Sequence, residues 1–125
     1  MSSEKLGQFA GQKYLNLESY RKDGRAVRTP VWFAEQDGVL YAYTYATAGK
    51  VKRIRRNPRV RLVPCNLWGK PKGEWVEATA RIEDVAGSER GERLLRQKYG
   101  WKKIIGDFFT RLRHRDRVVL SLRLD

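Results

Sequence analysis

The chain has 125 residues, and its 27 lysines and arginines outnumber its 14 aspartates and glutamates, so the formal net charge is +13. This length fits one domain, residues 1–125, and so basic a surface favours anionic partners: nucleic acid, acidic membranes or small phosphorylated molecules. The one cysteine, Cys65, excludes an internal disulfide, and the sequence has no Cys/His cluster for zinc. Because no apolar run reaches the ~20 residues of a transmembrane helix and residues 1–5 lack the apolar core of a signal peptide, we expect a cytoplasmic protein without a membrane span.

The N-terminal third of the chain predicts three strands. Residues 13–20 alternate with period two and place their leucines on one side, as a half-buried strand does. Asp23-Gly24 is a typical hairpin turn, and it leads into a second extended stretch over residues 25–34. Asp37-Gly38 makes the next turn into a third strand over residues 39–45. The three strands are therefore expected to form a meander.

Further along the chain, strand patterns alternate with short amphipathic ones. We expect strands over 59–65, 74–85 and 118–124, helices over 50–57, 87–99 and 101–112, and a turn-rich loop over 68–73. Asn57-Pro58 ends the first helix, because the residue before a proline avoids the helical region. Six strands with small helical insertions predict a mainly β fold, a closed or partly closed barrel, since closure removes exposed strand edges.

A basic run stands where the third strand meets the first helix. Seven basic residues and no acidic ones lie between positions 50 and 61, directly after the small residues Thr47-Ala48-Gly49. A helix start leaves backbone N–H groups unpaired, and with the helix dipole these groups form a seat for phosphate. Lys50 lies in the first turn, where its ammonium can reach the same anion, and Arg53 follows on the same side. The alternative is a solvated basic helix without a ligand.

The second strand carries a proline, which cannot donate to a β-ladder. Pro30 therefore marks an edge, a bulge or a place where something other than a strand lies alongside. In a meander the segment 28–33 would lie next to residues 40–45, beside the phosphate seat, and a flat heteroaromatic ring could rest there. The alternative is that Pro30 caps an edge strand and Trp32 belongs to the core.

Several of these segments resemble a known family. The run from Lys13 to Cys65, with R-T-P-V-W-F, G-K-V-K-R-I-R-R-N-P-R-V and V-P-C in order, is similar to the pyridoxamine 5'-phosphate oxidase-like, FMN-binding split barrels. Within them it most resembles the small F420-dependent oxidoreductases of mycobacteria and their relatives. The later segments W-V-E-A-T-A-R-I and R-Q-K-Y-G also fit, so the resemblance covers nearly the whole chain. It implies a six-stranded split β-barrel.

The resemblance also implies a cofactor and a site. The cofactor would be coenzyme F420, or alternatively FMN, held in a groove between the two subunits of a homodimer. Lys50 would bind its phosphate, the strand and turn before Lys50 would line the ribityl-phosphate end, and the R-T-P-V-W strand would back the ring. The expected cofactor-binding residues are Arg28, Thr29, Pro30, Val31, Trp32, Tyr43, Thr44, Thr47, Ala48, Gly49, Lys50, Arg53 and Arg56.

One departure from the wider family concerns the turn before the helix. FMN-dependent oxidases of this group usually carry Ser-Arg-Lys there, whereas this chain has Ala48-Gly49-Lys50 and so lacks that hydroxyl and that guanidinium. The C-terminal elements that those oxidases use for pyridoxal phosphate have no counterpart here, so vitamin B6 oxidation is not predicted. The deazaflavin carries a phosphodiester and a glutamate tail, which the arginines after Lys50 would suit, although one surface ion pair contributes only ~0–1 kcal/mol.

The expected activity is hydride transfer to a small unsaturated organic substrate, which requires the protein mainly to orient the cofactor. Tyr43 and Tyr45 are candidate proton donors, while the single histidine, His114, reads as a solvated surface residue. Two alternatives stay open. The first is a carrier that binds the cofactor without turnover. The second is a basic barrel that binds single-stranded nucleic acid through exposed aromatics such as Trp68 and Trp75, although we expect no nucleic-acid partner.

Overall fold

The computed structural model describes residues 2–45, 47–99 and 117–125. The predicted helix over 101–112 and the single histidine, His114, lie outside these residues. So do residues 111–116 of the arginine-rich stretch before the last strand. None of the described helices is long and apolar enough to cross a membrane.

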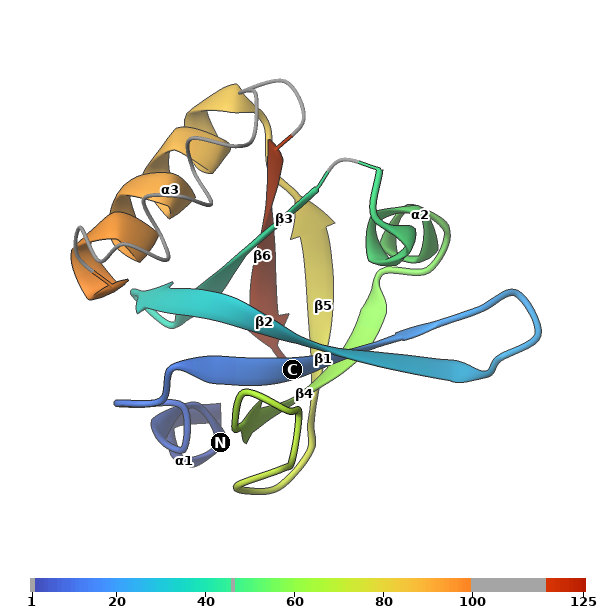
Figure 1. Ribbon diagram of the computed structural model, residues 1–125, viewed down its shortest axis with the longest axis horizontal. Coiled ribbons are helices and arrows are strands. Elements are labelled where there is room, and N and C mark those ends of the chain that lie inside the picture. Colours follow the sequence, from blue (N-terminus) through green and yellow to red (C-terminus); the bar gives the residue numbers. More distant parts are fainter. Residues whose placement is uncertain (1, 46, 100–116) are drawn as a thin grey trace.

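Six antiparallel strands close into a barrel in the order β1-β2-β3-β6-β5-β4 (Figure 1). All six match strands predicted from the sequence, and the barrel confirms the expected mainly β fold. Their bounds are β1 Tyr14–Tyr20, β2 Ala26–Gln36, β3 Val39–Tyr45, β4 Arg59–Cys65, β5 Val76–Ile82 and β6 Arg117–Leu124. Closure pairs the chain's first strand with its fourth and its third with its last, so the core is assembled from distant segments.

The core fills the barrel from alternate positions of every strand. Leu15 and Leu17 of β1, Leu40 of β3, Leu62 of β4 and Leu120 of β6 are fully buried. At about 25 cal/mol for each Å² of apolar surface removed from water, each leucine stabilises the fold by about 2 kcal/mol. This alternation fixes the register of the strands, because a one-residue shift would turn the leucines out to water.

A tight turn joins β2 to β3, as the sequence predicts. Gln36 pairs with Val39, so only Asp37 and Gly38 form the loop, and both have positive φ, at 53° and 83°. A hairpin turn of this kind needs left-handed backbone at both central positions, which Asp-Gly supplies at little cost.

Strands β2 and β3 pair at one end only. The ladder runs from Gln36 opposite Val39 to Phe33 opposite Ala42 and goes no further. Upstream of Phe33, β2 pairs with β1 alone, and Pro30 lies opposite Asn16 there. The sequence predicts that residues 28–33 lie beside residues 40–45. Within residues 28–33, only Phe33 pairs with β3. Pro30, which has no N–H to donate, lies in the stretch where the two strands separate.

Three helices surround the barrel in the described chain: α1 Ser2–Gly7, α2 Gly49–Arg56 and α3 Val85–Tyr99. The sequence predicts the second and third, with bounds that differ by one or two residues, and its local patterns indicate no element at α1. Helix α2 buries Val51 and Ile54, the two apolar residues of its predicted stripe. Helix α3 packs against β2, β3 and β6, on a different side of the barrel from α2 (Figure 1).

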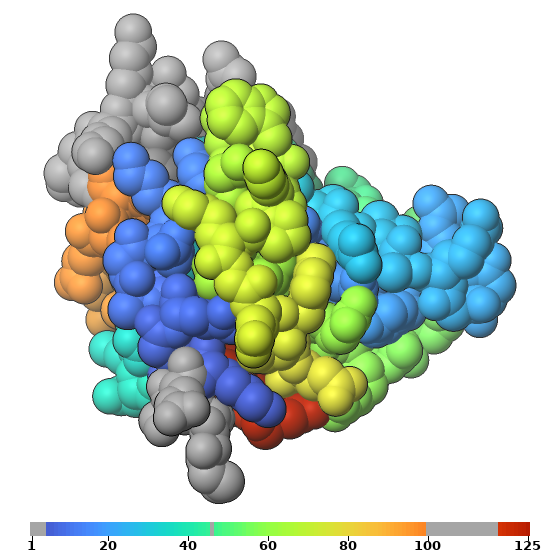
Figure 2. Space-filling view, turned by 90° about the horizontal axis from the view of Figure 1, so that it is seen from below, coloured from blue at the N-terminus to red at the C-terminus, as the bar shows by residue number. Residues whose placement is uncertain are grey.

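The segment between β4 and β5 crosses the outer face of the barrel. It is the green-to-yellow stretch in the middle of Figure 2. The amide nitrogen of Asn16 donates to the carbonyl of Gly69 across it (2.8 Å). Trp75, expected as part of β5, lies just before the strand and stacks under the guanidinium groups of Arg28 and Arg61 (4.8 and 5.2 Å to the ring centroid).

Candidate functional site

A cavity of about 280 Å³ opens where β2 and β3 separate. Six of the predicted site residues line it, from three different elements. They are Pro30, Val31 and Trp32 of β2, Tyr43 and Thr44 of β3, and Lys50 of α2. The expectation that the proline-bearing strand and the start of α2 border one space is therefore met in the geometry.

Three further residues line this cavity that were not in the predicted set: Tyr14, Tyr45 and Leu67. Tyr14 reaches it because the antiparallel register of β1 and β2 sets it opposite Trp32. A two-residue loop at Asp23-Gly24 would have set Tyr14 opposite Phe33, so the turn alone does not predict this pairing. Tyr45 was considered only as a proton donor. Leu67 comes from the loop after β4, and no local sequence pattern indicates where that loop packs.

Lys50 stands at the edge of the cavity with its charge uncompensated by the described residues. None of the described carboxylates lies within ion-pair distance of its ammonium, and the side chain is half-buried. Burial and the neighbouring Arg53 charge both lower the pKa of Lys50. A partly dehydrated cation beside another cation favours an incoming anion, because the anion offsets both penalties at once.

Arg53 lies across the start of α2. Its Nε donates to the hydroxyl of buried Ser19 (2.7 Å), and its Nη1 is 2.8 Å from where a Cβ on Gly49 would stand. Burial and the charges of Arg21 and Arg56 lower the pKa of Arg53. Ala48, at the N-cap, gives the first turn no side-chain hydrogen bond. The start of α2 is thus a corner of positive charge in which the Arg53 guanidinium occupies the space that a side chain at Gly49 would need.

The other predicted site residues do not line this cavity. Thr47 and Ala48 lie between β3 and α2, and Gly49 is the first residue of α2. The guanidinium of Arg56 donates to the carbonyl of Tyr20 (3.2 Å), and that of Arg28 pairs with Glu18 (2.6 Å) on the outer face of β1.

Thr29 faces the barrel interior, and its buried Oγ1 has no hydrogen-bond partner within the described chain. It lies on the same strand as the lining residues Pro30 and Val31 but is not itself part of the lining. It therefore belongs to the predicted set by sequence position and not by contact with the cavity.

The lining suits a flat ring with an acidic substituent. Aromatic side chains and a proline supply apolar surface, and one cation stands at the edge, which is the usual make-up of a small-molecule site. At about 280 Å³ the cavity is slightly smaller than the roughly 300–1,000 Å³ of pockets that enclose a whole ligand. Among the described residues, no group of histidine, cysteine and carboxylate side chains is arranged to hold a metal.

The family model described as "Pyridoxamine 5'-phosphate oxidase" matches residues 2–125 of this sequence. The chain belongs to the pyridoxamine 5'-phosphate oxidase family. This confirms the resemblance seen in the sequence. No curated protein matches the chain.

Solved structures share the fold of this family member at low identity. The heme storage protein HutZ from Vibrio cholerae is 16% identical, with a TM-score of 0.72 over 98% of this chain and 89% of its own. General Stress Protein 26 from Bacillus anthracis is 22% identical, with a TM-score of 0.65 over 100% and 91%. An F420 reductase is 20% identical, with a TM-score of 0.63 over 95% and 91%. These likenesses establish the split-barrel fold.

Proposed function

We propose that this member of the pyridoxamine 5'-phosphate oxidase family binds a phosphorylated flavin-type cofactor in the Lys50 cavity and reduces a small unsaturated organic substrate. The observation that supports this proposal best is that aromatic side chains and a half-buried lysine line the same cavity, and that no described carboxylate neutralises the lysine. When bound, such a cofactor supplies the hydride-transfer chemistry, and the protein supplies binding, orientation and the exclusion of water.

The phosphate end would sit at the start of α2. Lys50 would meet it as a point charge, and the backbone N–H groups of the first turn would add to this charge. Arg53 already holds its guanidinium over Gly49. It can therefore supply from within the helix the guanidinium that the Ala48-Gly49-Lys50 turn lacks relative to the Ser-Arg-Lys turn of FMN-dependent oxidases.

The ring end would lie against β2. Pro30 and Trp32 on one side and Tyr14 on the neighbouring strand offer flat surface, and backbone beyond the end of the β2–β3 ladder is free of strand partners on the β3 side. Tyr43 and Tyr45 both line this space, and Tyr45, which is 45% exposed, is the better candidate to hold a proton for the substrate, because the hydroxyl of Tyr43 is buried. Trp32 is itself fixed by Tyr99 of α3, at 6.2 Å between ring centroids.

We further propose that the working form is a homodimer whose partner chain completes the site. One chain's cavity is too small to enclose a whole cofactor, and apolar side chains stand exposed around its mouth. Tyr45 and Leu67 are 45% and 57% exposed, and the adjacent Trp68 is 83% exposed. Between the two cofactors we favour F420, because the basic corner at Lys50 and Arg53, with Arg21 and Arg56 nearby, suits its more negative tail.

Equilibrium titration of the purified protein with F420 and with FMN, followed by fluorescence, tests the proposal. Lys50→Ala should weaken binding of the preferred cofactor about 10- to 100-fold, because it removes one charge-assisted hydrogen bond. Lys52→Ala is the matched control. It removes the same charge from the same helix, but Lys52 is exposed and does not line the cavity. The affinity of this variant for the cofactor should therefore stay within about twofold of that of the wild type.

Wild-type protein that binds neither cofactor, or equal losses in the Lys50 and Lys52 variants, would refute the assignment. If both cofactor binding and its Lys50 dependence are observed, steady-state reduction assays decide between an enzyme and a carrier. A protein that binds the reduced cofactor tightly but does not oxidise it with any of a panel of unsaturated substrates is the carrier.

A further inference from the structure

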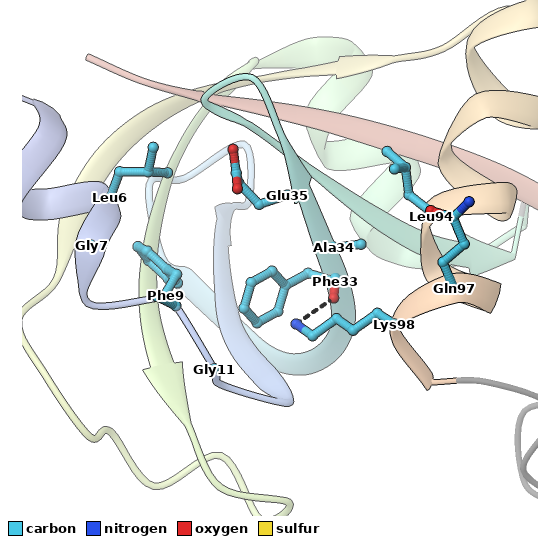
Figure 3. A pocket seen from close by; sticks show the side chains of 11 residues that line it. Leu6, Gly7, Phe9, Gly11, Phe33, Ala34, Glu35, Leu94, Gln97 and Lys98 are labelled. Carbon is cyan, nitrogen blue, oxygen red and sulfur yellow. Dashed lines mark hydrogen bonds between the residues drawn. The ribbon is translucent and has the colours of Figure 1, made fainter.

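A second and larger cavity, of about 650 Å³, lies at the other end of β2 (Figure 3). It is enclosed by the end of α1 and the following loop, by the last third of β2 and by the C-terminal turns of α3. It shares no lining residue with the Lys50 cavity. Figure 3 shows Leu6 and Phe9 facing Leu94 and Lys98 across it.

Lys98 brings a cation into this apolar space. Its Nζ donates to the carbonyl of Phe33 (2.8 Å) and lies 3.6 Å from the centroid of the Phe33 ring. No described carboxylate is within ion-pair distance of it, and Glu35, the one acidic lining residue, accepts the backbone N–H of Gly38 (2.8 Å). Burial lowers the pKa of Lys98 to about 8. The side chain keeps part of its surface in water, and its ammonium has only neutral partners among the described residues.

The rest of the lining is apolar. Leu6 and Leu94 are half-buried and present side-chain surface from opposite walls, and the buried rings of Phe9 and Phe33 meet edge to face behind them (5.8 Å, 82°). Apolar walls with a few polar groups that fix orientation are typical of a small-molecule site, and about 650 Å³ is an ordinary volume for one.

We propose that this cavity is a second ligand site, which takes a small amphipathic monocarboxylate. The carboxylate pairs with the ammonium of Lys98, and the apolar chain lies along Leu6, Phe9 and Leu94. A carboxylate fits better than a neutral head group, because it gives the ammonium, whose partners in the described chain are all neutral, a charged one. The inference is independent of the cofactor proposal, since the two cavities have separate linings.

Tyr99, the neighbour of Lys98, contacts a residue of each cavity, Phe33 and Trp32. Its hydroxyl accepts the N–H of Phe33 (3.1 Å) and lies within hydrogen-bond reach of the carbonyls of Phe33 and Lys13. Its ring packs on Trp32, which faces the Lys50 cavity. The final turn of α3 therefore contacts residues of both cavities, although Tyr99 itself lines neither.

Octanoate and its neutral isostere octanamide are suitable probes, titrated calorimetrically and by amide chemical shifts of the full chain. Octanoate should bind at least about tenfold more tightly than octanamide. It should shift amides within residues 6–11, 33–35 and 94–98. Lys98→Met should remove the preference for the acid while leaving octanamide affinity within about twofold, and Lys98→Arg should keep the preference. Lys52→Met is the matched control for the loss of one positive charge, and it should behave as the wild type.

Equal affinity for the acid and the amide, or an unchanged preference in Lys98→Met, would overturn the proposal. So would shifts confined to residues outside the three segments, which would indicate general attraction of an anion to a basic protein. Octanamide binding reports whether the Lys98 variants are folded. The shift map of the wild type needs no variant, so a folding failure would leave that test intact. Loss of F420 and FMN binding would refute the cofactor proposal and leave this one standing.

Discussion

Glu18 lies on the outward-facing side of β1, yet its side chain is only 1% exposed. Arg28 from β2 and Arg61 from β4 each approach one of its carboxylate oxygens to 2.6 Å, and the Tyr20 hydroxyl donates to it at 2.8 Å. Burial raises the pKa of Glu18, but the hydrogen bonds from Arg61, Arg28 and Tyr20 outweigh it and bring the pKa down to about 2. Ion pairs of this carboxylate therefore link β1 to both of its neighbours, β2 and β4.

Glu18→Gln should lower the free energy of unfolding at neutral pH by about 2–3 kcal/mol, because the folded state holds the carboxylate's proton less tightly than the unfolded chain does. A depressed pKa contributes its stability above the unfolded value of about 4.3, and the contribution is lost as pH falls toward about 2. The wild type should thus lose stability over this acidic window more steeply than the variant. Urea unfolding at several pH values measures both effects.

Glu77→Gln is the control for this prediction, because Glu77 is an exposed glutamate on β5. Its stability should stay within about 0.5 kcal/mol of the wild type. Parallel pH profiles for the wild type and Glu18→Gln would show that the cluster contributes no pH-dependent stability.

At the scale of an element, α3 is held close to the barrel by a glycine. Gly91 is buried, and a Cβ at that position would stand 2.5 Å from Cγ1 of Val119 on β6. The predicted apolar stripe of this helix is confirmed at Leu95, which is buried, while Leu94 and Tyr99 are half-buried. The close approach at Gly91 sets how deeply Lys98 and Tyr99, two turns further on, reach over β2.

Gly91→Ala should destabilise the protein by about 1–2 kcal/mol. Overpacking of this kind costs about 1–3 kcal/mol, and the better helix propensity of alanine returns up to about 1 kcal/mol. The substitution should cost less in a Val119→Ala background, because that change removes the methyl group in conflict. Denaturant unfolding of the two single variants and the double variant measures the coupling.

Arg90→Ala provides the comparison on the same helix. Arg90 is exposed, so its replacement should change stability by no more than about 0.5 kcal/mol. Additive effects of Gly91→Ala and Val119→Ala would contradict the steric explanation.

For the whole molecule, the apolar surface near the Lys50 cavity is the feature that a monomer leaves unexplained. Leu67 and Trp68 project from the loop after β4 with more than half of their surface in water. A chain with formal charge +13 would repel a second copy unless apolar contact or bound anions offset the repulsion. The proposed dimer would bury this rim and bring the partner's residues to the cofactor.

Sedimentation of the wild type should therefore show a dimer, and Leu67→Glu should shift it to a monomer, because the dimer contact would have to bury an unpaired carboxylate. Val85→Glu is the control: Val85 is also an exposed apolar residue, 67% exposed, but it lies at the start of α3 and lines neither cavity. A wild-type monomer at all concentrations, or equal effects of the two substitutions, would refute the dimer contact.

Much of this protein was readable from local patterns. The strand alternation, the Asp37-Gly38 turn and the helix after Gly49 depend on neighbouring residues, and backbone preferences act over just that range. The family resemblance rests on such segments too. Helix α1 was not predicted, because its six residues are too few to display helical periodicity.

Tertiary structure alone decided the rest. The separation of β2 from β3 depends on register and closure around six strands, so Pro30 indicated that something other than a strand lies alongside but not that Tyr14 and Leu67 line the space. The burial of Glu18 depends on Arg61, 43 residues away in the chain. Leu67 lines the cavity from a loop after β4, and no local pattern places it there. Whether a side chain lies in water or in the core depends on which distant parts of the chain pack over it. A local sequence pattern does not contain that information.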